Sequence, residues 1–417
     1  MRKLPEDVTG RNYAEGVIDY TNKGDVYMKV VVLGAGLMGK EIARDLVDSK
    51  EVETVYLADL SIENAKEFVD TLNTKKVEVV QLDADCDEDL REVMGRGNVV
   101  INALFYTFNE RVAKAAIDVG VHSVDLGGHI GGITESIFQL NNLAAEKGVT
   151  IIPDLGVAPG MVNILAGYGA TKLDTVDSIK LYVGGIPTEP KPPLHYTRVF
   201  SLDGVFDHYT EPSKMIQKGI LAEVESLTGI EPIYFDEFGV LEAFYTSGGI
   251  STLYKTFPNV KTLEYKTIRY KGHAEKFKLL AELGFLDKNN TVEAGGQEVN
   301  VREVTKEVLK KKLDLGKKTD AVLLRAIISG EKSEEQITYE YEMVVRKDLE
   351  KNVTAMARAT ANTISVVAQM VGNGMITERG VIAPESVVPG REFIKEMAKR
   401  GVDIKETSHR SSMIVKW

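Results

Sequence analysis

Three glycines, Gly34, Gly36 and Gly39, have the spacing G-x-G-x-x-G, which lets a backbone approach a phosphate group. The first glycine of such a loop makes a tight turn, the second admits a pyrophosphate, and the third allows close helix–strand contact. An apolar run at 30–33 precedes the loop and a helical pattern follows it, so the positive end of a helix would face the phosphates. We therefore predict a dinucleotide-binding turn with contacts from Gly34, Gly36, Leu37, Met38 and Gly39.

Asp59 lies about 20 residues beyond this loop, where an acid takes the ribose hydroxyls of a dinucleotide. Its carboxylate would repel the 2′-phosphate of NADP, so we predict NAD as the cofactor. Later strand ends supply more candidate contacts. Asp83 and Ala84 would lie near the adenine or else in an exposed loop, and Ala103 and Leu104 would border the nicotinamide ribose.

The run Asp125-Leu-Gly-Gly-His129 is the most suggestive acid–base cluster of the chain. His129 is the side chain there with an ordinary pKa near neutrality, although a lone histidine is more often structural. Asp125 could orient that histidine or attract a substrate ammonium group directly. We predict catalytic roles for both residues. The sequence has neither a spaced His/Cys/Glu set for a metal nor a G-x-S-x-G nucleophile turn, so we predict no metal site.

These residues need a scaffold that brings strand ends together, and the pattern over residues 28–156 provides one. Strand-like runs at 30–33, 54–58, 77–82, 99–104, 123–126 and 150–153 alternate with helical patterns such as 40–48 and 110–119. Strands that alternate with helices indicate a parallel, doubly wound α/β sheet of the Rossmann type. The carboxyl ends of its strands form one edge, where ligands bind.

Beyond residue 156 the pattern changes. Strand candidates at 177–183, 260–270 and 337–346 lack regularly alternating helices, which favours a second α+β domain with a largely antiparallel sheet over 157–350. Residues 287–304 are polar and we expect a loop there. An apolar stripe along 354–371 predicts a helix within a C-terminal helical segment, 351–417, that returns towards the Rossmann domain. Residues 1–27 are expected to form an N-terminal extension.

Composition narrows the classes of partner. A net charge of −11 argues against nucleic acid, and the absence of an apolar stretch near 20 residues argues against a membrane span. The single cysteine excludes an internal disulfide and fits a reducing compartment. We therefore expect a cytoplasmic enzyme with a small-molecule substrate. A large β-rich second domain would support a homo-oligomer.

Several motifs in one order resemble the saccharopine dehydrogenase-like family over nearly the whole chain from Met28. They are the glycine loop 30–39, Asn102-Ala-Leu-Phe-Tyr-Thr-Phe108, the 125–129 cluster, Asp154-Leu-Gly-Val-Ala-Pro-Gly-Met161, Tyr182-Val-Gly-Gly-Ile-Pro187, Ile268-Arg-Tyr-Lys-Gly-His273 and 356–380. Within the family, the chain looks most like the bacterial L-lysine 6-dehydrogenases. The resemblance implies that Tyr106 is catalytic, and that Gly156 and Val157 lie beside the cofactor in a segment that is also a hinge.

The resemblance also implies a reaction. A hydride leaves the ε-carbon of L-lysine for NAD, the imine is hydrolysed with loss of ammonia, and the semialdehyde closes onto its own α-amine. Such a substrate needs a cation for its carboxylate, for which Arg198 is suited, and an acid for its α-ammonium, from Asp203 or Glu242. The full set of predicted substrate contacts is Tyr182, Gly184, Gly185, His195, Arg198, Asp203, Glu242 and His273.

Two kinds of alternative remain open. Another family activity, glutamate-forming saccharopine dehydrogenase or carboxynorspermidine dehydrogenase, would use the same fold. Saccharopine reductases have an arginine where this chain has Asp203, and we expect the loss of that cation to favour lysine. A protein of another class, a non-catalytic NAD-binding sensor or assembly protein, would keep the fold without the chemistry.

Overall fold

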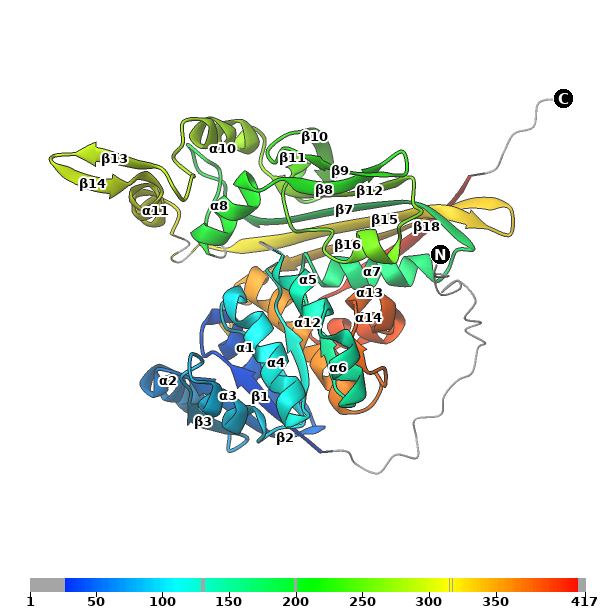
Figure 1. Ribbon diagram of the computed structural model, residues 1–417. Coiled ribbons are helices and arrows are strands. Elements are labelled where there is room, and N and C mark those ends of the chain that lie inside the picture. The colour runs from blue at the N-terminus through cyan, green and yellow to red at the C-terminus, as the bar shows by residue number, and fades with distance from the viewer. Residues whose placement is uncertain (1–26, 129–131, 199–200, 315, 317, 412–417) are drawn as a thin grey trace, which may run out of the picture.

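The computed structural model describes residues 27–128, 132–198, 201–314, 316 and 318–411. Two large sheets dominate the molecule, one in the lower body and one across the top, with helices packed between them (Figure 1). The larger hydrophobic core is continuous across the two, because buried residues of both sheets and of the intervening helices belong to one cluster.

The first sheet is wholly parallel and has the order β17-β6-β5-β4-β1-β2-β3. The chain order reverses between β1 and β4, which is the switch point where doubly wound sheets bind ligands. Its strands are β1 (Met28–Leu33), β2 (Val52–Asp59), β3 (Val77–Gln81), β4 (Val99–Asn102), β5 (His122–Asp125), β6 (Thr150–Ile152) and β17 (Gly380–Val381). The predicted Rossmann-type sheet is confirmed.

Helices cover both faces of this sheet, and each buries one apolar side. In α1, for example, Ile42, Ala43 and Leu46 are buried at helical spacing. The helices of this part are α1 (Leu37–Asp48), α2 (Ile62–Leu72), α3 (Asp87–Met94), α4 (Asn109–Val119), α5 (Ile133–Phe138) and α6 (Asn141–Glu146), with a short 3₁₀ turn at Tyr106–Phe108.

The second sheet is mixed but largely antiparallel, as predicted, with the order β10-β11-β12-β7-β15-β16-β18 and β8 and β9 beside β12. Only β7 and β12 pair in parallel. The strands are β7 (Thr175–Pro187), β8 (Ser213–Gln217), β9 (Ile220–Val224), β10 (Glu231–Phe235), β11 (Gly239–Tyr245), β12 (Thr262–Arg269), β15 (Asp320–Lys332), β16 (Glu335–Arg346) and β18 (Ile404–Ser411).

Helix α12 (Ala355–Gly372) lies between the two layers and contacts β4, β5, β15 and β16. Its start is fixed by Asp320, whose carboxylate accepts the N–H groups of Ala355 and Met356, and by the N-cap Thr354. The remaining helices are α7 (Met161–Ala170), α8 (Leu202–Thr210), α9 (Leu253–Thr256), α10 (His273–Glu282), α11 (Val301–Lys312), α13 (Pro384–Val387) and α14 (Gly390–Lys399).

Two expectations need correction. The segment 287–304 is not a loop throughout, because it forms the hairpin β13 (Thr291–Ala294) and β14 (Gln297–Asn300) and the first turn of α11. The C-terminal segment is not only helical, since β17 joins the first sheet and β18 the second. Among the helices of the described ranges, none has the length and apolarity to cross a bilayer.

Candidate active site

The glycine loop between β1 and α1 has the geometry that its spacing predicts. Gly34 has a φ of +96°, and its N–H donates to the carbonyl of Ala58. A Cβ at Gly39 would lie 1.8 Å from the carbonyl oxygen of Gly34, so that position tolerates only glycine. A Cβ at Gly36 would meet nothing within 4 Å. The first and third glycines therefore build the loop, and the second leaves open space beside it.

The helix that follows offers its N-terminus to that space. No side chain caps α1 and no acid lies in its first turn, so its N–H groups and dipole are available for an anion. Asp59 lies beside the loop, where one carboxylate oxygen accepts the N–H of Ala35 at 2.6 Å and the other that of Ser61 at 2.8 Å. These residues fit a dinucleotide whose pyrophosphate sits at Gly36.

The predicted contacts on the neighbouring strands lie along the same carboxyl edge. The carbonyl of Ala103 closely approaches Gly34, and the N–H of Leu104 donates to the side chain of Asn102. Asp83 accepts the N–H of Asp85 in the turn after β3, and the adjacent Ala84 carbonyl accepts a hydrogen bond from an arginine of α4. Their proposed contacts with a cofactor stay predictions.

Asp125 lies inside the protein rather than in an open site. It is 4% exposed, and one carboxylate oxygen accepts hydrogen bonds from the Asn109 amide and from the N–H groups of Gly127 and Asp154. Burial, reinforced by the neighbouring Asp154, raises the pKa of Asp125 to about 7. The structure thus shows Asp125 holding the loop ends, and its catalytic role stays a prediction.

Tyr106 follows β4 and packs against Gly128, where any Cβ would collide with its side chain. Burial, and then the negative charge of Asp207 in α8, raises the pKa of Tyr106, so its phenol stays protonated at neutral pH. Such a hydroxyl can donate a hydrogen bond but cannot act as a base. His129, the third predicted catalytic residue, lies outside the described residues.

A cavity of about 280 Å³ lies between the two sheets. Met38, Leu126, Gly156 and Val157 form its wall on the side of the first sheet, next to the glycine loop. The opposite wall comes from strands and helices of the second domain. Its members are Val183, Gly185, His208, Tyr209, Thr246, Ser247, Tyr265, Thr267 and Arg269, with Met356 and Thr360 of α12. The predicted residues Met38, Gly156, Val157 and Gly185 are therefore brought together.

Arg269, at the end of β12, is the charged group of this cavity. It is 4% exposed, its Nη1 donates to the carbonyl of Ile268, and its buried Nε has no hydrogen-bond partner. No ion pair joins Arg269 to any acid in the described ranges. A buried guanidinium without a carboxylate is costly, so Arg269 offers a site for an anion that enters the cavity.

Tyr209 bonds to this guanidinium, and His273 bonds to Tyr209. His273 is 1% exposed and stacks on Phe277 with 4.5 Å between ring centroids. Burial and the positive charge of Arg269 keep the pKa of His273 well below its ordinary value, so the ring is neutral. Its Nδ1 faces the Leu194 carbonyl at 3.3 Å and must carry the proton. Nε2 therefore accepts the Tyr209 hydroxyl at 2.9 Å, leaving the phenol lone pairs for Arg269.

His208 of α8 also lines the cavity. Burial lowers its pKa from the ordinary value, and its Nδ1 lies 2.9 Å from the carbonyl of Ser247. The neutral ring donates from Nδ1 to that carbonyl, which leaves Nε2 as the basic nitrogen. His208 is thus a neutral imidazole in the lining of the cavity.

Several predicted substrate contacts face elsewhere. Side chains alternate across β7, so Tyr182 and Gly184 point to the opposite face from Val183 and Gly185, and the Tyr182 hydroxyl donates to Glu231. Glu242 accepts the N–H groups of Gly272 and Ala274 at the start of α10. It caps that helix and does not line the cavity.

The other predicted contacts also lie outside the cavity lining. Asp203 pairs with Lys306 at 3.2 Å and with Arg302 at 3.6 Å, so it does not mark a missing cation of the substrate site. Arg198 and His195 belong to the loop between β7 and α8, and the backbone N–H of Arg198 donates to Leu313. His273 contributes only through Tyr209.

The sequence did contain signals for the residues that were missed. Arg269 stands in a strand whose other residues are almost all buried, and a permanent charge there requires a partner. His208 lies on the same helix as Asp203, five positions further along. No group of three or more potential metal ligands occurs among the residues that the structure describes.

Two family models match adjoining parts of the chain. The saccharopine dehydrogenase NADP binding domain matches residues 30–152, and the saccharopine dehydrogenase C-terminal domain matches residues 156–402. The mitochondrial α-aminoadipic semialdehyde synthase of Bos taurus is 26% identical over 304 residues, 69% of this chain and 31% of that protein. The NADP⁺-linked, L-glutamate-forming saccharopine dehydrogenase of Saccharomyces cerevisiae is 26% identical over 294 residues, 67% of this chain and 63% of that protein. The matches thus span less than two thirds of these curated relatives.

The solved structure of the apo L-Glu-forming saccharopine dehydrogenase from Saccharomyces cerevisiae shares the fold. Its TM-score is 0.76 at 18% sequence identity, over 92% of this chain and 100% of that one. At this identity the likeness concerns the fold alone. The family models, in contrast, cover both walls of the cavity and the loop at Gly36. The chain therefore belongs to the saccharopine dehydrogenase family.

Proposed function

We propose that this protein is an NAD-dependent oxidoreductase that oxidises the ε-amino carbon of L-lysine and releases ammonia. The observation that carries the proposal is Arg269, a buried guanidinium with no acidic partner among the described residues. It faces a cavity whose other wall borders the glycine loop. Such a group fits the carboxylate of an amino acid. Bound through its carboxylate, the substrate extends its side chain towards Met38 and Gly156.

The number of cations in the cavity favours lysine over saccharopine. Among the described lining residues, Arg269 is the single lysine or arginine. Lysine carries one carboxylate, whereas saccharopine carries carboxylates on both its lysine and its glutamate parts. Additional buried carboxylates would need additional cations or donors. This argument replaces the one from Asp203, which lies outside the cavity.

The lining also favours a reactive, neutral amine. The described lining has no aspartate or glutamate, and Arg269 adds positive charge, so both effects disfavour an ammonium form. His208 is neutral and can accept the proton that the amine must lose. When bound, the nicotinamide accepts the hydride from the carbon that bears the amine. The resulting imine adds water and loses ammonia, and the semialdehyde closes onto its own α-amine.

The preference for NAD rests on Asp59. Both of its carboxylate oxygens accept backbone N–H groups at the loop, which holds a negative charge beside the expected ribose. That charge would repel a 2′-phosphate. The matched family model and the yeast relative bear NADP in their names, so the experiment must compare NAD with NADP.

Steady-state formation of reduced cofactor tests the proposal directly. L-lysine, saccharopine and carboxynorspermidine would each be offered with NAD and with NADP. We expect turnover with lysine and NAD. Turnover with saccharopine alone would replace the proposal by the activity of the yeast relative. Dinucleotide binding without oxidation of any of these amines would support a non-catalytic NAD-binding sensor instead.

A further inference from the structure

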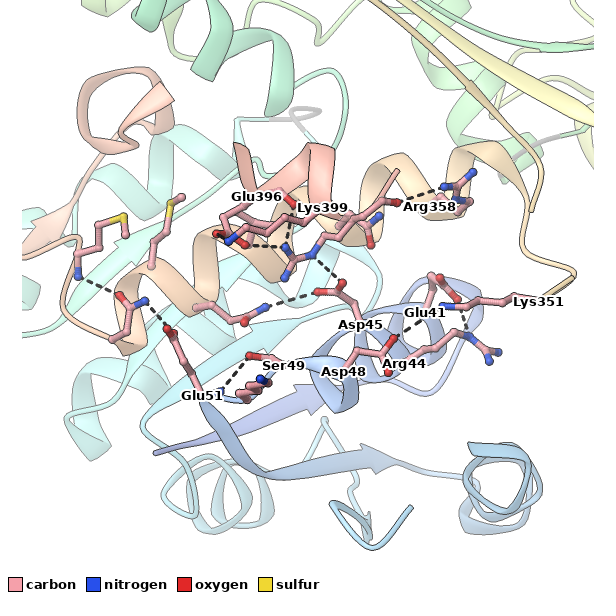
Figure 2. Close-up of a pocket in the computed structure, with 18 of the residues that line it drawn as sticks. Glu41, Arg44, Asp45, Asp48, Ser49, Glu51, Lys351, Arg358, Glu396 and Lys399 are labelled. Atoms are coloured by element: carbon pink, nitrogen blue, oxygen red, sulfur yellow. Dashed lines mark hydrogen bonds and ion pairs between the residues drawn. The ribbon is translucent and has the colours of Figure 1, made fainter. Parts of the chain in front are cut away.

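A second cavity lies away from the substrate cavity. It has a volume of about 600 Å³ and lies between α1, α12 and α14, beside the first sheet (Figure 2). Glu41, Asp45 and Asp48 of α1 form one wall, and Glu396 and Lys399 of α14 form the facing wall. No residue of the proposed lysine or dinucleotide contacts lines it, so it needs a separate explanation.

Asn362 of α12 is the first sign of a ligand. Its side chain lines this cavity, is 5% exposed and makes no hydrogen bond to any described residue. Its amide atoms are not among the fully buried polar atoms that lack a partner, so they reach the open space of the cavity and can bond to water or to a ligand there. Asn362 is therefore a polar group presented to the cavity.

Arg358, one helical turn earlier on the same side of α12, is the second sign. Its guanidinium donates only to the carbonyls of Arg346, Arg400 and Gly401, and no described acid lies within ion-pair distance. Arg358 and Asn362 together offer a positive charge and an amide N–H from adjacent turns. That pair suits a carboxylate.

The other charged groups of the lining are mostly engaged with one another. Glu41 pairs with Arg44 at 3.0 Å, Arg400 with Asp45 at 2.7 Å and with Glu396 at 3.0 Å, and Lys399 with Glu396 at 2.6 Å; Lys351 lies 3.7 Å from Asp48. The remaining lining charges are Arg358, Lys50, Glu51 and Asp348, two of each sign. A multiply charged anion such as phosphate would face these acids, whereas a dipolar ligand satisfies both signs.

We propose that this cavity is a second ligand site, which binds a free α-amino acid through Arg358 and Asn362 and communicates with the substrate cavity through α12. The carboxylate bonds to Arg358 and Asn362. The ammonium group faces Asp348. This residue lies two positions beyond Arg346, whose carbonyl accepts a hydrogen bond from Arg358.

Two helices, α12 and α1, connect this cavity with the proposed active site. Met356 and Thr360 of α12 line the substrate cavity, whereas Arg358 and Asn362 of the same helix line this one. Helix α1 begins at the glycine loop and contributes Glu41 and Asp45 here. An occupant would contact both helices, and a ligand that binds one arrangement of them better shifts the protein towards it.

Isothermal titration calorimetry of the full chain with L-glutamate and L-alanine tests the site without relying on turnover. Acetate and ethylamine serve as probes of each half of the ligand. We expect an amino acid to bind in the millimolar range or tighter. Its affinity should fall about tenfold in Asn362→Leu, which keeps the side-chain size. A similar loss is expected in Arg358→Gln, which alters a less buried side chain and therefore serves as the control for misfolding.

Arg269→Met provides the discriminating control. It removes the carboxylate contact of the substrate cavity, so amino-acid binding that survives in this variant belongs to the second site. Binding that disappears in Arg269→Met and persists in Asn362→Leu would overturn the proposal, as would an absence of binding to the unaltered chain. Neither outcome depends on whether lysine is the substrate.

Discussion

The two walls of the substrate cavity are built in different ways. On the side of the first sheet, the lining at Met38, Leu126 and 156–159 adjoins a glycine loop and a helix N-terminus, whose geometry is set by the backbone. On the second sheet, it is mostly side chains from β7, α8, β12 and α12, which are far apart in the sequence. Under the proposed function, dinucleotide binding belongs to one side and substrate choice to the other, so substitutions should separate the two.

The largest effect is expected at Gly39, where the glycine loop has no room. Gly39→Ala places a Cβ 1.8 Å from the Gly34 carbonyl, so the loop must move. We expect a loss of stability of at least about 1–3 kcal/mol and no measurable dinucleotide binding. Thermal unfolding and cofactor titration by fluorescence would check this.

Gly36→Ala is the matched control for that change. The added methyl meets no protein atom within 4 Å, so folding should be unaffected. It would occupy the space assigned to the pyrophosphate, and NAD affinity should fall by about tenfold or more. Equal NAD affinity in Gly36→Ala and the unaltered chain would mean that the cofactor does not lie there.

His273→Phe should affect only the side-chain wall. Phenylalanine keeps the stacking on Phe277 but removes the Nε2 acceptor of the Tyr209 hydroxyl. Since one hydrogen bond contributes about 1 kcal/mol, we expect the KM for lysine to rise about fivefold to tenfold. NAD affinity and the melting temperature should change little. A parallel loss of NAD affinity would instead indicate a general structural role.

Asp125→Asn tests the junction between the walls by its pH dependence. In the folded protein the pKa of Asp125 is about 7, above its ordinary value, so the folded state holds a proton that the unfolded state has lost. Stability should therefore fall as the pH rises from the ordinary carboxyl pKa to about 7, by on the order of 1–3 kcal/mol. In urea unfolding across this pH range, the free energy of unfolding of the variant should depend less on pH than that of the unaltered chain. The same dependence of unfolding free energy on pH in both proteins would contradict the raised pKa of Asp125.

Tyr182→Phe should have the smallest effect. Its hydroxyl bonds to Glu231 on the face of β7 that is turned away from the cavity. We expect less than a twofold change in kcat/KM and a stability loss of about 0.5–1 kcal/mol. A large increase in the KM for lysine would restore Tyr182 as a substrate contact.

The same contrast explains what the sequence could predict. The glycine loop depends on backbone conformations that only glycine permits, so Gly34 and Gly39 can be identified from spacing alone. The strands of the first sheet are buried on both faces and appear as apolar runs. Residue types and their local spacing were enough to predict the fold of this half of the molecule.

The other half depends on contacts between distant segments. Strand β18 is polar, Ile-Lys-Glu-Thr-Ser-His-Arg-Ser, and forms by backbone pairing with β16 rather than by apolar alternation. Arg269 becomes a candidate carboxylate contact only once the fold places the end of β12 on the cavity that Met38 also lines. Glu242 could not be recognised as the cap of α10 before the position of that helix was known.

The most direct test of the central claim compares lysine with cadaverine, which is lysine without its carboxylate. The ratio of kcat/KM for the two amines would be measured with NAD in the unaltered chain and in Arg269→Met. If Arg269 holds the carboxylate, the unaltered chain prefers lysine and the variant loses about 10- to 100-fold of that preference, the effect of a charged hydrogen bond. The same preference in both proteins would contradict the account.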